Sequence, residues 1–246
     1  MQSFGHYKIK VHKLFAALAR SSYRRALLSH GTAASIEHDA VLRDMPYDFV
    51  ADVGANRGQF SLAALRWRPQ ARIVAFEPLD RPGAIYQAIF RDNPGVTLHQ
   101  VALAPERGEM TINISRRDDS SSLLPISSLQ TENFPGTQRV GEKKVPVAPL
   151  TDFIGIADLV GAALLKLDVQ GFELPVLRSA EPLLPFFRWI YAECSFRPLY
   201  DGQALADEIE AYLAARNFRK GRVANLSRER GNGKPLQADF LFERIK

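Results

Sequence analysis

The stretch Asp48-Phe-Val-Ala-Asp-Val-Gly-Ala-Asn-Arg-Gly58 decides the fold of this 246-residue chain. A short apolar run ends at Val53 and is followed at once by Gly54 and then by Gly58. From Phe60 onward, apolar residues recur at the spacing of one helix face. A strand, a glycine turn and a helix in this order are typical of the first unit of a doubly wound α/β sheet. Ligands of such sheets bind beyond the carboxyl ends of the strands.

The alternation of strand and helix continues along the chain, with one interruption. Strands that alternate with helices indicate a mostly parallel sheet, and the count predicts seven strands. Further strands are expected at 72–76, 96–102, 163–168, 188–193, 218–226 and 237–243, and further helices at 82–91, 173–184 and 203–216.

The interruption has the pattern of an inserted antiparallel pair. Residues 109–115 and 143–147 alternate with period two, which predicts two half-buried strands. The segment between them, 116–141, is polar and rich in Ser, Asp and Gly, which predicts a mobile loop. We therefore expect an inserted hairpin and loop over about residues 104–150.

The first 44 residues precede the alternating pattern and form a separate N-terminal helical extension in our interpretation. Apolar residues recur among basic ones between residues 7 and 28, as in an amphipathic helix. Such a helix either packs on the main domain or makes peripheral contact with a membrane surface. Residues 45–246 are then expected to form one domain.

Composition narrows the class of protein. Hydrophobic residues make up 46% and charged residues 24%, which are ordinary values for a folded globular chain and argue against disorder. The net charge of +5 leaves nucleic acid open as a partner, but the basic residues form no dense block, so that partner is disfavoured. Cys194 is the only cysteine, which excludes an internal disulfide and favours a cytoplasmic location. No apolar run is long enough to predict a transmembrane segment.

The glycine turn has the spacing Gly-x-x-x-Gly, and Asn56 stands where a dinucleotide-binding turn has its middle glycine. That middle glycine lets the backbone approach a pyrophosphate. The turn therefore suits a nucleoside without phosphates, and S-adenosylmethionine is such a ligand. A glycine turn with a purely structural role is the alternative.

Glu77 follows the second predicted strand, and Pro78 prevents that strand from continuing. An acid at this place in a doubly wound sheet typically accepts hydrogen bonds from ribose hydroxyls. Backbone groups near Ala102, at the end of the third predicted strand, could meet the adenine edge. A solvated acid at a strand end is the alternative interpretation of Glu77.

Four charged residues mark the later strands. Lys166 and Asp168 lie two apart, so they point to one face of a strand whose other residues are apolar. Asp168 is our candidate for a general base or a metal ligand, and a structural Lys–Asp pair is the alternative. Glu173 begins a helix, where the dipole favours a carboxylate. Glu193 ends the fifth strand at the same edge of the sheet.

These motifs together resemble the FkbM family of methyltransferases over residues 45–246. The most specific motif is Lys166-Leu-Asp-Val-Gln-Gly-Phe-Glu173. The other motifs are residues 49–60 around the glycine turn, Phe-Glu-Pro at 76–78, Ser-Ser-Ser-Leu at 120–123 and Glu-Cys-Ser-Phe at 193–196.

The resemblance implies a Rossmann-like class I methyltransferase fold and methyl transfer from S-adenosylmethionine to oxygen. By position, the cofactor would be held by Asp52, Gly54, Ala55, Asn56, Gln59, Phe60, Glu77, Pro78 and Ala102. The catalytic residues would be Lys166, Asp168 and Glu173, and the acceptor would be framed by Ser121, Ser122, Glu193 and Tyr200. Acceptors in the family are typically hydroxyls of sugars, glycolipids or natural products.

The hypothesis is therefore an O-methyltransferase in which Asp168 takes or relays the hydroxyl proton. Mg²⁺ held by Asp168 and a neighbouring acid is an alternative means of activation. Methylation of RNA or another nucleic acid, and a non-catalytic domain that binds S-adenosylmethionine, are the alternative functions. A nicotinamide oxidoreductase is disfavoured because the middle glycine is missing. We also expect a homo-oligomer.

Overall fold

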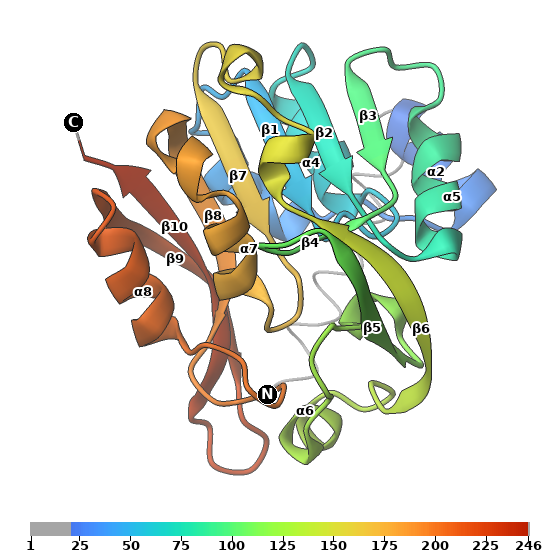
Figure 1. The fold of residues 1–246 in the computed structure, drawn as a ribbon. Coiled ribbons are helices and arrows are strands. Elements are labelled where there is room, and N and C mark those ends of the chain that lie inside the picture. Colours follow the sequence, from blue (N-terminus) through green and yellow to red (C-terminus); the bar gives the residue numbers. More distant parts are fainter. Residues whose placement is uncertain (1–20, 246) are drawn as a thin grey trace.

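Seven strands form one sheet in the computed structural model, which describes residues 21–245 (Figure 1). In spatial order they are β3 (Val96–His99), β2 (Arg72–Phe76), β1 (Phe49–Val53), β7 (Ala163–Leu167), β8 (Phe187–Ser195), β10 (Pro235–Arg244) and β9 (Phe218–Arg228). Within this sheet, β10 runs in the opposite direction to the other six strands. The predicted α/β fold, with a seven-stranded and mostly parallel sheet, is therefore confirmed.

Helices cover both faces of the sheet, which explains why every residue of β1 and β7 is buried. The side chains of β1 alternate between two apolar clusters, one on each face. One face packs against α2 (Ser21–His30), α3 (Asp39–Leu42), α4 (Gln59–Trp67) and α5 (Asp80–Phe90). The other packs against α7 (Glu173–Ser179) and α8 (Ala206–Ala214).

The predicted inserted hairpin is present and slightly longer than expected. Its strands are β5 (Gly108–Ser115) and β6 (Arg139–Ala148), paired antiparallel. They extend beyond the carboxyl ends of the parallel strands (Figure 1). The short strand β4 (Ala102–Leu103) pairs with β6 and completes a second, three-stranded sheet. The third strand predicted at 96–102 is therefore wrong in extent, since its last residue belongs to the second sheet.

The segment 116–141, which we predict to be a mobile loop, contains regular secondary structure. This segment contains a 3₁₀ turn, η2 (Asp118–Ser120), and a short helix, α6 (Ser128–Asn133). It is fixed to the rest of the protein by bridges from Ser122 to Asn113 and from Ile126 to Tyr200. Polar composition misled the prediction, because these side chains are used in hydrogen bonds within the insertion.

Part of the predicted amphipathic helix lies outside the described residues. The described part of the N-terminal extension packs on the main domain: Tyr23 and Leu42 are buried in the cluster around α4. A 3₁₀ turn, η1 (Ile36–His38), follows α2 and reaches the carboxyl ends of the strands. None of the helices in residues 21–245 combines the length and apolarity that a membrane crossing requires.

Candidate active site

A cavity of about 820 Å³ lies at the carboxyl ends of β1, β2, β7 and β8. Its size suits a small organic ligand with a partner molecule beside it. The turns after these strands form its floor. Residues 31–38, 117–123 and 225–227 form its walls, so the N-terminal extension, the insertion and β9 all contribute to it.

The glycine turn offers no free backbone amide for a phosphate group. The N–H groups of Gly54 and Ala55 both donate to the carbonyl of Phe76, at 3.0 Å each. The next three backbone N–H groups also donate hydrogen bonds within the protein. Asn56 N donates to Glu77 Oε2 at 3.0 Å, Arg57 N to Gln59 Oε1 at 3.0 Å and Gly58 N to Ala55 O at 2.8 Å. A phosphate-binding turn needs such groups unpaired. The geometry therefore fits the phosphate-free nucleoside that the spacing predicts.

Glu77 points toward this turn, as the sequence predicts. Its Oε2 accepts from Asn56 N at 3.0 Å and its Oε1 accepts from Leu79 N at 2.8 Å. Each oxygen keeps a further lone pair, so the carboxylate can still receive two hydroxyl groups from the cavity. Burial raises the pKa of Glu77 to about 7, against the effect of these two backbone hydrogen bonds.

Position 54 must be a glycine because the loop that carries Asp168 lies directly against it. Its φ is +74°, and an added Cβ would lie 1.8 Å from the carbonyl oxygen of Asp168. At Gly58, with φ +90°, an added Cβ would meet the Phe90 ring of α5 at 2.5 Å. The first glycine thus lets two strand-end turns touch, and the second lets α5 pack against the turn.

Lys166 pairs with Asp52 and not with Asp168. The two are direct neighbours in the β1–β7 register, and Lys166 Nζ lies 3.0 Å from Asp52 Oδ1. The same ammonium donates to the carbonyl of Gly54 at 2.8 Å. Asp52 Oδ2 accepts from Ser61 Oγ at 2.6 Å. Asp52 is fully buried and does not line the cavity, so this geometry favours a role in holding the turn over direct contact with the cofactor.

The remaining predicted cofactor residues do line the cavity. They surround Glu77 together with apolar side chains that suit a flat, uncharged ring. The predicted residues are Gly54, Ala55, Asn56, Gln59, Phe60, Pro78 and Ala102, and the apolar neighbours are Leu79, Val101, Leu103 and Ile112.

Asp168 and Glu193 lie on the other side of the cavity and are joined by one amide. Gln170 Nε2 donates to Asp168 Oδ1 at 2.7 Å and to Glu193 Oε2 at 3.1 Å. The second oxygen of Glu193 accepts from Gln237 Nε2 at 2.7 Å. Burial and the nearby carboxylates raise the pKa of Glu193 well above its ordinary value. The result is a set of fixed polar groups facing the cavity.

Hydrogen bonds from Ser122 and Tyr200 hold Gln170 in place. Its φ of +54° is unusual for a residue with a side chain, and its backbone carbonyl accepts from Ser122 Oγ at 2.7 Å. Tyr200 donates its hydroxyl to Gln170 Oε1 at 2.6 Å, which turns the amide nitrogen toward the carboxylates. Tyr200 itself is buried and does not line the cavity, whereas the predicted Ser121 and Ser122 do.

Glu173 is buried at the start of α7 and does not line the cavity. Its Oε1 accepts from Val169 N and Gly171 N, both at 3.2 Å. Burial raises the pKa of this carboxyl group to about 7. Its position favours a role in fixing the loop that carries Asp168 and Gln170.

Several residues of the cavity wall carried no signal that sequence reasoning could use. Gln170 lies inside the most specific motif, and only its place beside Asp168 could have suggested it. The others come from distant elements: Glu37 and His38 from η1, Asp118 and Asp119 from the insertion, and Asn225, Gln237 and Asp239 from β9 and β10. Among residues 21–245, no three His, Cys, Asp or Glu side chains converge as metal ligands.

Residues 52–220, more than half of the chain, match the sequence model of the "Methyltransferase FkbM domain" family. The chain belongs to the FkbM methyltransferase family. It is therefore an S-adenosylmethionine-dependent methyltransferase, as the motifs predict. The family match includes the turn, Glu77 and Asp168, but it excludes η1 and β10.

Two curated relatives align with the sequence of this FkbM methyltransferase over more than half of its length. It is 27% identical over 190 residues to "2-O-methyltransferase NoeI" of Sinorhizobium fredii, covering 73% of this chain and 78% of the relative. It is 30% identical over 171 residues to "Methyltransferase 1" of Beauveria bassiana, covering 58% of this chain and 66% of the relative.

Solved structures of methyltransferases share the general arrangement at low identity. One is magnesium protoporphyrin IX methyltransferase (ChlM) of Synechocystis PCC 6803 with bound SAM, at 12% identity and a TM-score of 0.42, covering 85% of this chain and 81% of that one. Another is the tRNA methyltransferase TrmK of B. subtilis, at 10% identity and a TM-score of 0.48, covering 87% and 67%. At these values the two structures say nothing of the acceptor of this FkbM methyltransferase.

Proposed function

We propose that this FkbM methyltransferase methylates a hydroxyl oxygen of a sugar, glycolipid or related natural product. The observation that carries the proposal is the row of fixed hydrogen-bonding groups on the acceptor side: Asp168, Gln170, Glu193 and Gln237. Carboxylates and amides suit an acceptor with several hydroxyl groups, because a carboxylate accepts hydrogen bonds from hydroxyls and an amide can both accept and donate them. One relative, the 2-O-methyltransferase NoeI, agrees with oxygen as the methylated atom.

The residues divide the work between two parts of the cavity. Glu77 would receive the ribose hydroxyls of S-adenosylmethionine, and the apolar groups around Leu103 would take the adenine ring. The bound cofactor supplies an electrophilic methyl group on sulfur. Asp168 and Glu193 would receive hydroxyl groups of the acceptor and hold the molecule at a fixed distance and direction. Positioning of this kind accounts for much of the rate gain in a transfer between two bound molecules.

The donors around Asp168 support a reaction without Mg²⁺. The amide nitrogen of Gln170 lies within hydrogen-bond distance of both Asp168 and Glu193, so the space between the two carboxylates faces an N–H donor. Mg²⁺ requires oxygen ligands in near-octahedral geometry. We therefore propose that turnover persists in the presence of a chelator.

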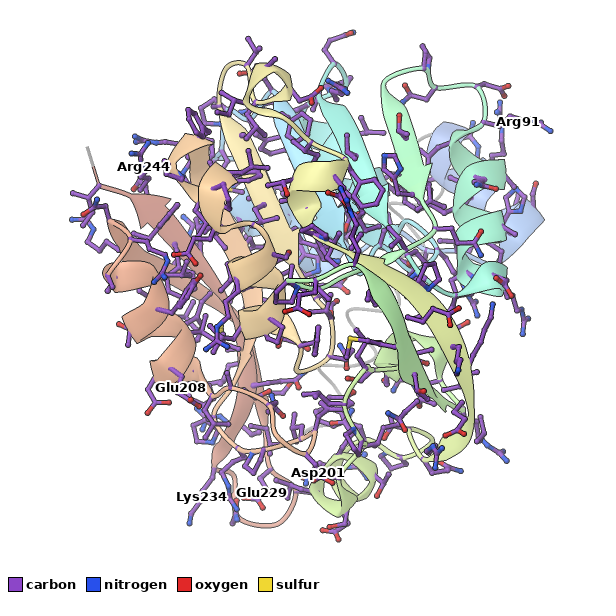
Figure 2. All side chains as sticks on the ribbon, in the orientation of Figure 1. Arg91, Asp201, Glu208, Glu229, Lys234 and Arg244 are labelled. Carbon is purple, nitrogen blue, oxygen red and sulfur yellow. The ribbon has the colours of Figure 1, made fainter. Side chains whose placement is uncertain are left out.

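The distribution of basic groups supports a small acceptor over a nucleic acid. Figure 2 shows Arg91 and Lys234 at separate parts of the outline of the protein. Several basic side chains in the described part of the chain lie in ion pairs, among them Arg57 with Asp118 and Arg222 with Asp44. A nucleic-acid site would instead gather its basic groups on one face.

A screen with methyl-labelled S-adenosylmethionine tests the function. Neutral sugars, glycolipids, hydroxylated natural products and short RNAs are incubated with the protein, with and without EDTA, and products are read by mass. The proposal expects a labelled methyl group on one hydroxylated acceptor class, unaffected by EDTA. Methylation of RNA alone, or calorimetry that detects no S-adenosylmethionine binding, would contradict it.

A further inference from the structure

His38 lies in the cavity wall, and it comes from a part of the chain outside the family match. Its Nδ1 lies 3.0 Å from the hydroxyl of Tyr191, 3.3 Å from Asn225 Nδ2 and 3.4 Å from Asp239 Oδ2. Asp239 is largely buried and comes from β10, which also lies outside the family match. The ring is therefore oriented by groups from three strands that meet only in the folded chain.

Two of these contacts, to Tyr191 and Asp239, indicate which ring nitrogen carries the proton, whereas the third partner, Asn225 Nδ2, is itself a donor and gives a hydrogen to Asp239 Oδ2 at 2.6 Å. Tyr191 donates its hydroxyl to Asp239 Oδ2 at 3.0 Å. Burial, reinforced by the Asp239 carboxylate, raises the pKa of Tyr191, so the phenol keeps its proton. Its oxygen can then only accept from His38, which requires a hydrogen on Nδ1. A neutral ring protonated at Nδ1 presents an unshared electron pair at Nε2.

His38 is also tied to the cofactor side of the cavity. Its ring packs edge-on against Phe60, with centroids 5.3 Å apart, and Phe60 stands in the first turn of the helix after the glycine turn. The backbone N–H of Ser35 donates to the carbonyl of Gln59 at 3.0 Å. Within the described residues Nε2 has no hydrogen-bond partner, so it is available to a molecule in the cavity.

We propose that His38 is the proton acceptor of the methyl transfer, oriented by Asp239 and Tyr191. This inference rests on the proposed function. The acceptor's O–H proton passes to Nε2 as the oxygen forms its bond to the methyl carbon and the carbon–sulfur bond breaks. The products are the methyl ether, S-adenosylhomocysteine and an imidazolium, whose charge faces the Asp239 carboxylate. The imidazolium then loses its proton to water.

The imidazole is better suited to this task than Asp168. As side-chain types, imidazole is a stronger base than a carboxylate by about two pH units, which favours it near neutrality. Asp168 Oδ1 already accepts a hydrogen bond from Gln170, which leaves this carboxylate suited to binding a hydroxyl. A base oriented by a buried acid is also the arrangement that recurs where a hydroxyl must be activated.

The first test needs no acceptor. Long-range ¹H–¹⁵N spectra of protein with ¹⁵N-labelled histidine, recorded well above the ordinary imidazole pKa of about 6.5, report the tautomer of each ring. Comparison with His38→Asn identifies one ring among the five. We expect a hydrogen on Nδ1 and none on Nε2, and a smaller share of that tautomer in Asp239→Asn. A hydrogen on Nε2 in the wild type would overturn the proposal.

The second test uses the acceptor found in the screen. His38→Asn should bind S-adenosylmethionine within about threefold of the wild type, lose about 10²- to 10⁴-fold in kcat, and regain activity with added imidazole. Asp239→Asn should lower kcat with little change in KM. His30→Asn, at the end of α2 and outside the cavity, is the matched control. Unchanged kcat in His38→Asn would refute the role of His38 and leave the proposed function standing, whereas a wild type that methylates nothing would refute the function.

Discussion

The two sides of the cavity are built in different ways. On the cofactor side, the turn at 54–58 and Glu77 lie close in sequence and are held by backbone hydrogen bonds. On the acceptor side, residues from η1, the insertion, the loop after β7, and β8, β9 and β10 meet through side-chain hydrogen bonds. The first side lies within the family match, and the second lies partly outside it. In the proposed function, a local unit would hold the cofactor and residues brought together by the tertiary structure would choose the acceptor.

The comparison predicts that variants on the acceptor side alter turnover and spare cofactor binding. Asp168→Asn should lower kcat by about 10²-fold or more, because the acceptor loses a charged partner. Its affinity for S-adenosylmethionine should stay within about threefold of the wild type. Calorimetry and steady-state kinetics measure the two values. Unchanged turnover would mean that Asp168 has no part in the mechanism. Lost cofactor binding would contradict the assignment of Asp168 to the acceptor side alone.

Variants on the cofactor side should do the opposite. Glu77→Gln removes the charge that receives two hydroxyls and places an amide N–H against the backbone N–H of Asn56 or Leu79. We expect the Kd for S-adenosylmethionine to rise about 100-fold, since hydrogen bonds to a charged group contribute about 1.5–3 kcal/mol each. Glu106→Gln, at an exposed position outside the cavity, is the control. Equal affinities for the two variants would contradict the assignment of Glu77.

The contact between the two sides can be tested at Gly54. An alanine there would place Cβ against the carbonyl of Asp168 while the backbone keeps a positive φ. We expect a loss of about 2–3 kcal/mol in the free energy of unfolding. Gly108→Ala is the matched control, because nothing lies within 4 Å of its added Cβ. Denaturant titration compares the two, and equal stability would mean that the turns can move apart.

Cofactor affinity should depend on pH through Glu77. The pKa of about 7 in the free protein should fall when hydroxyls donate to the carboxylate, because they favour its ionised form. Binding then releases a proton, so affinity is highest above pH 7 and falls as the pH drops below it. We expect about tenfold weaker binding at pH 6 than at pH 8. Glu77→Gln serves as the reference for titration of the ligand itself, and an identical pH profile in both proteins would contradict this origin.

The smallest effect is expected where an ion pair joins the two sides. Arg57, in the glycine turn, pairs with Asp118 of the insertion, and both side chains are partly exposed. Arg57→Ala should weaken S-adenosylmethionine binding by about two- to fivefold, since pairs of this exposure contribute about 1 kcal/mol or less. Arg139→Ala, which removes the exposed pair with Glu142 on β6, is the control. A loss far larger than this would make the pair a principal part of the cofactor site.

The fold and the cofactor side could be predicted because their signals are local. The apolar run before Gly54, the helix spacing after it and the acid that follows the next strand all lie within about one structural unit. The structure that each of these signals specifies depends only on neighbouring residues and on the rule that parallel strands end at one edge of the sheet. Glu77 therefore lies where the pattern places it.

The sequence pattern could not predict which charged side chains form ion pairs or hydrogen bonds with one another. The spacing of Lys166 and Asp168 in the sequence suggested that these two residues pair. The strand register instead places Lys166 beside Asp52, and the ion pair forms there. The hydrogen bonds of Glu173 and Tyr200 direct these side chains into loops and away from the cavity.

By itself the sequence determined the doubly wound sheet, the glycine turn and the acid beside that turn, because short-range periodicity and strand ends specify them. Only the tertiary structure decided the acceptor side. His38 and Asp239 stand near opposite ends of the chain and meet because β10 inserts between β8 and β9 and η1 packs across them. Such long-range packing leaves no spacing in the sequence that could have predicted it.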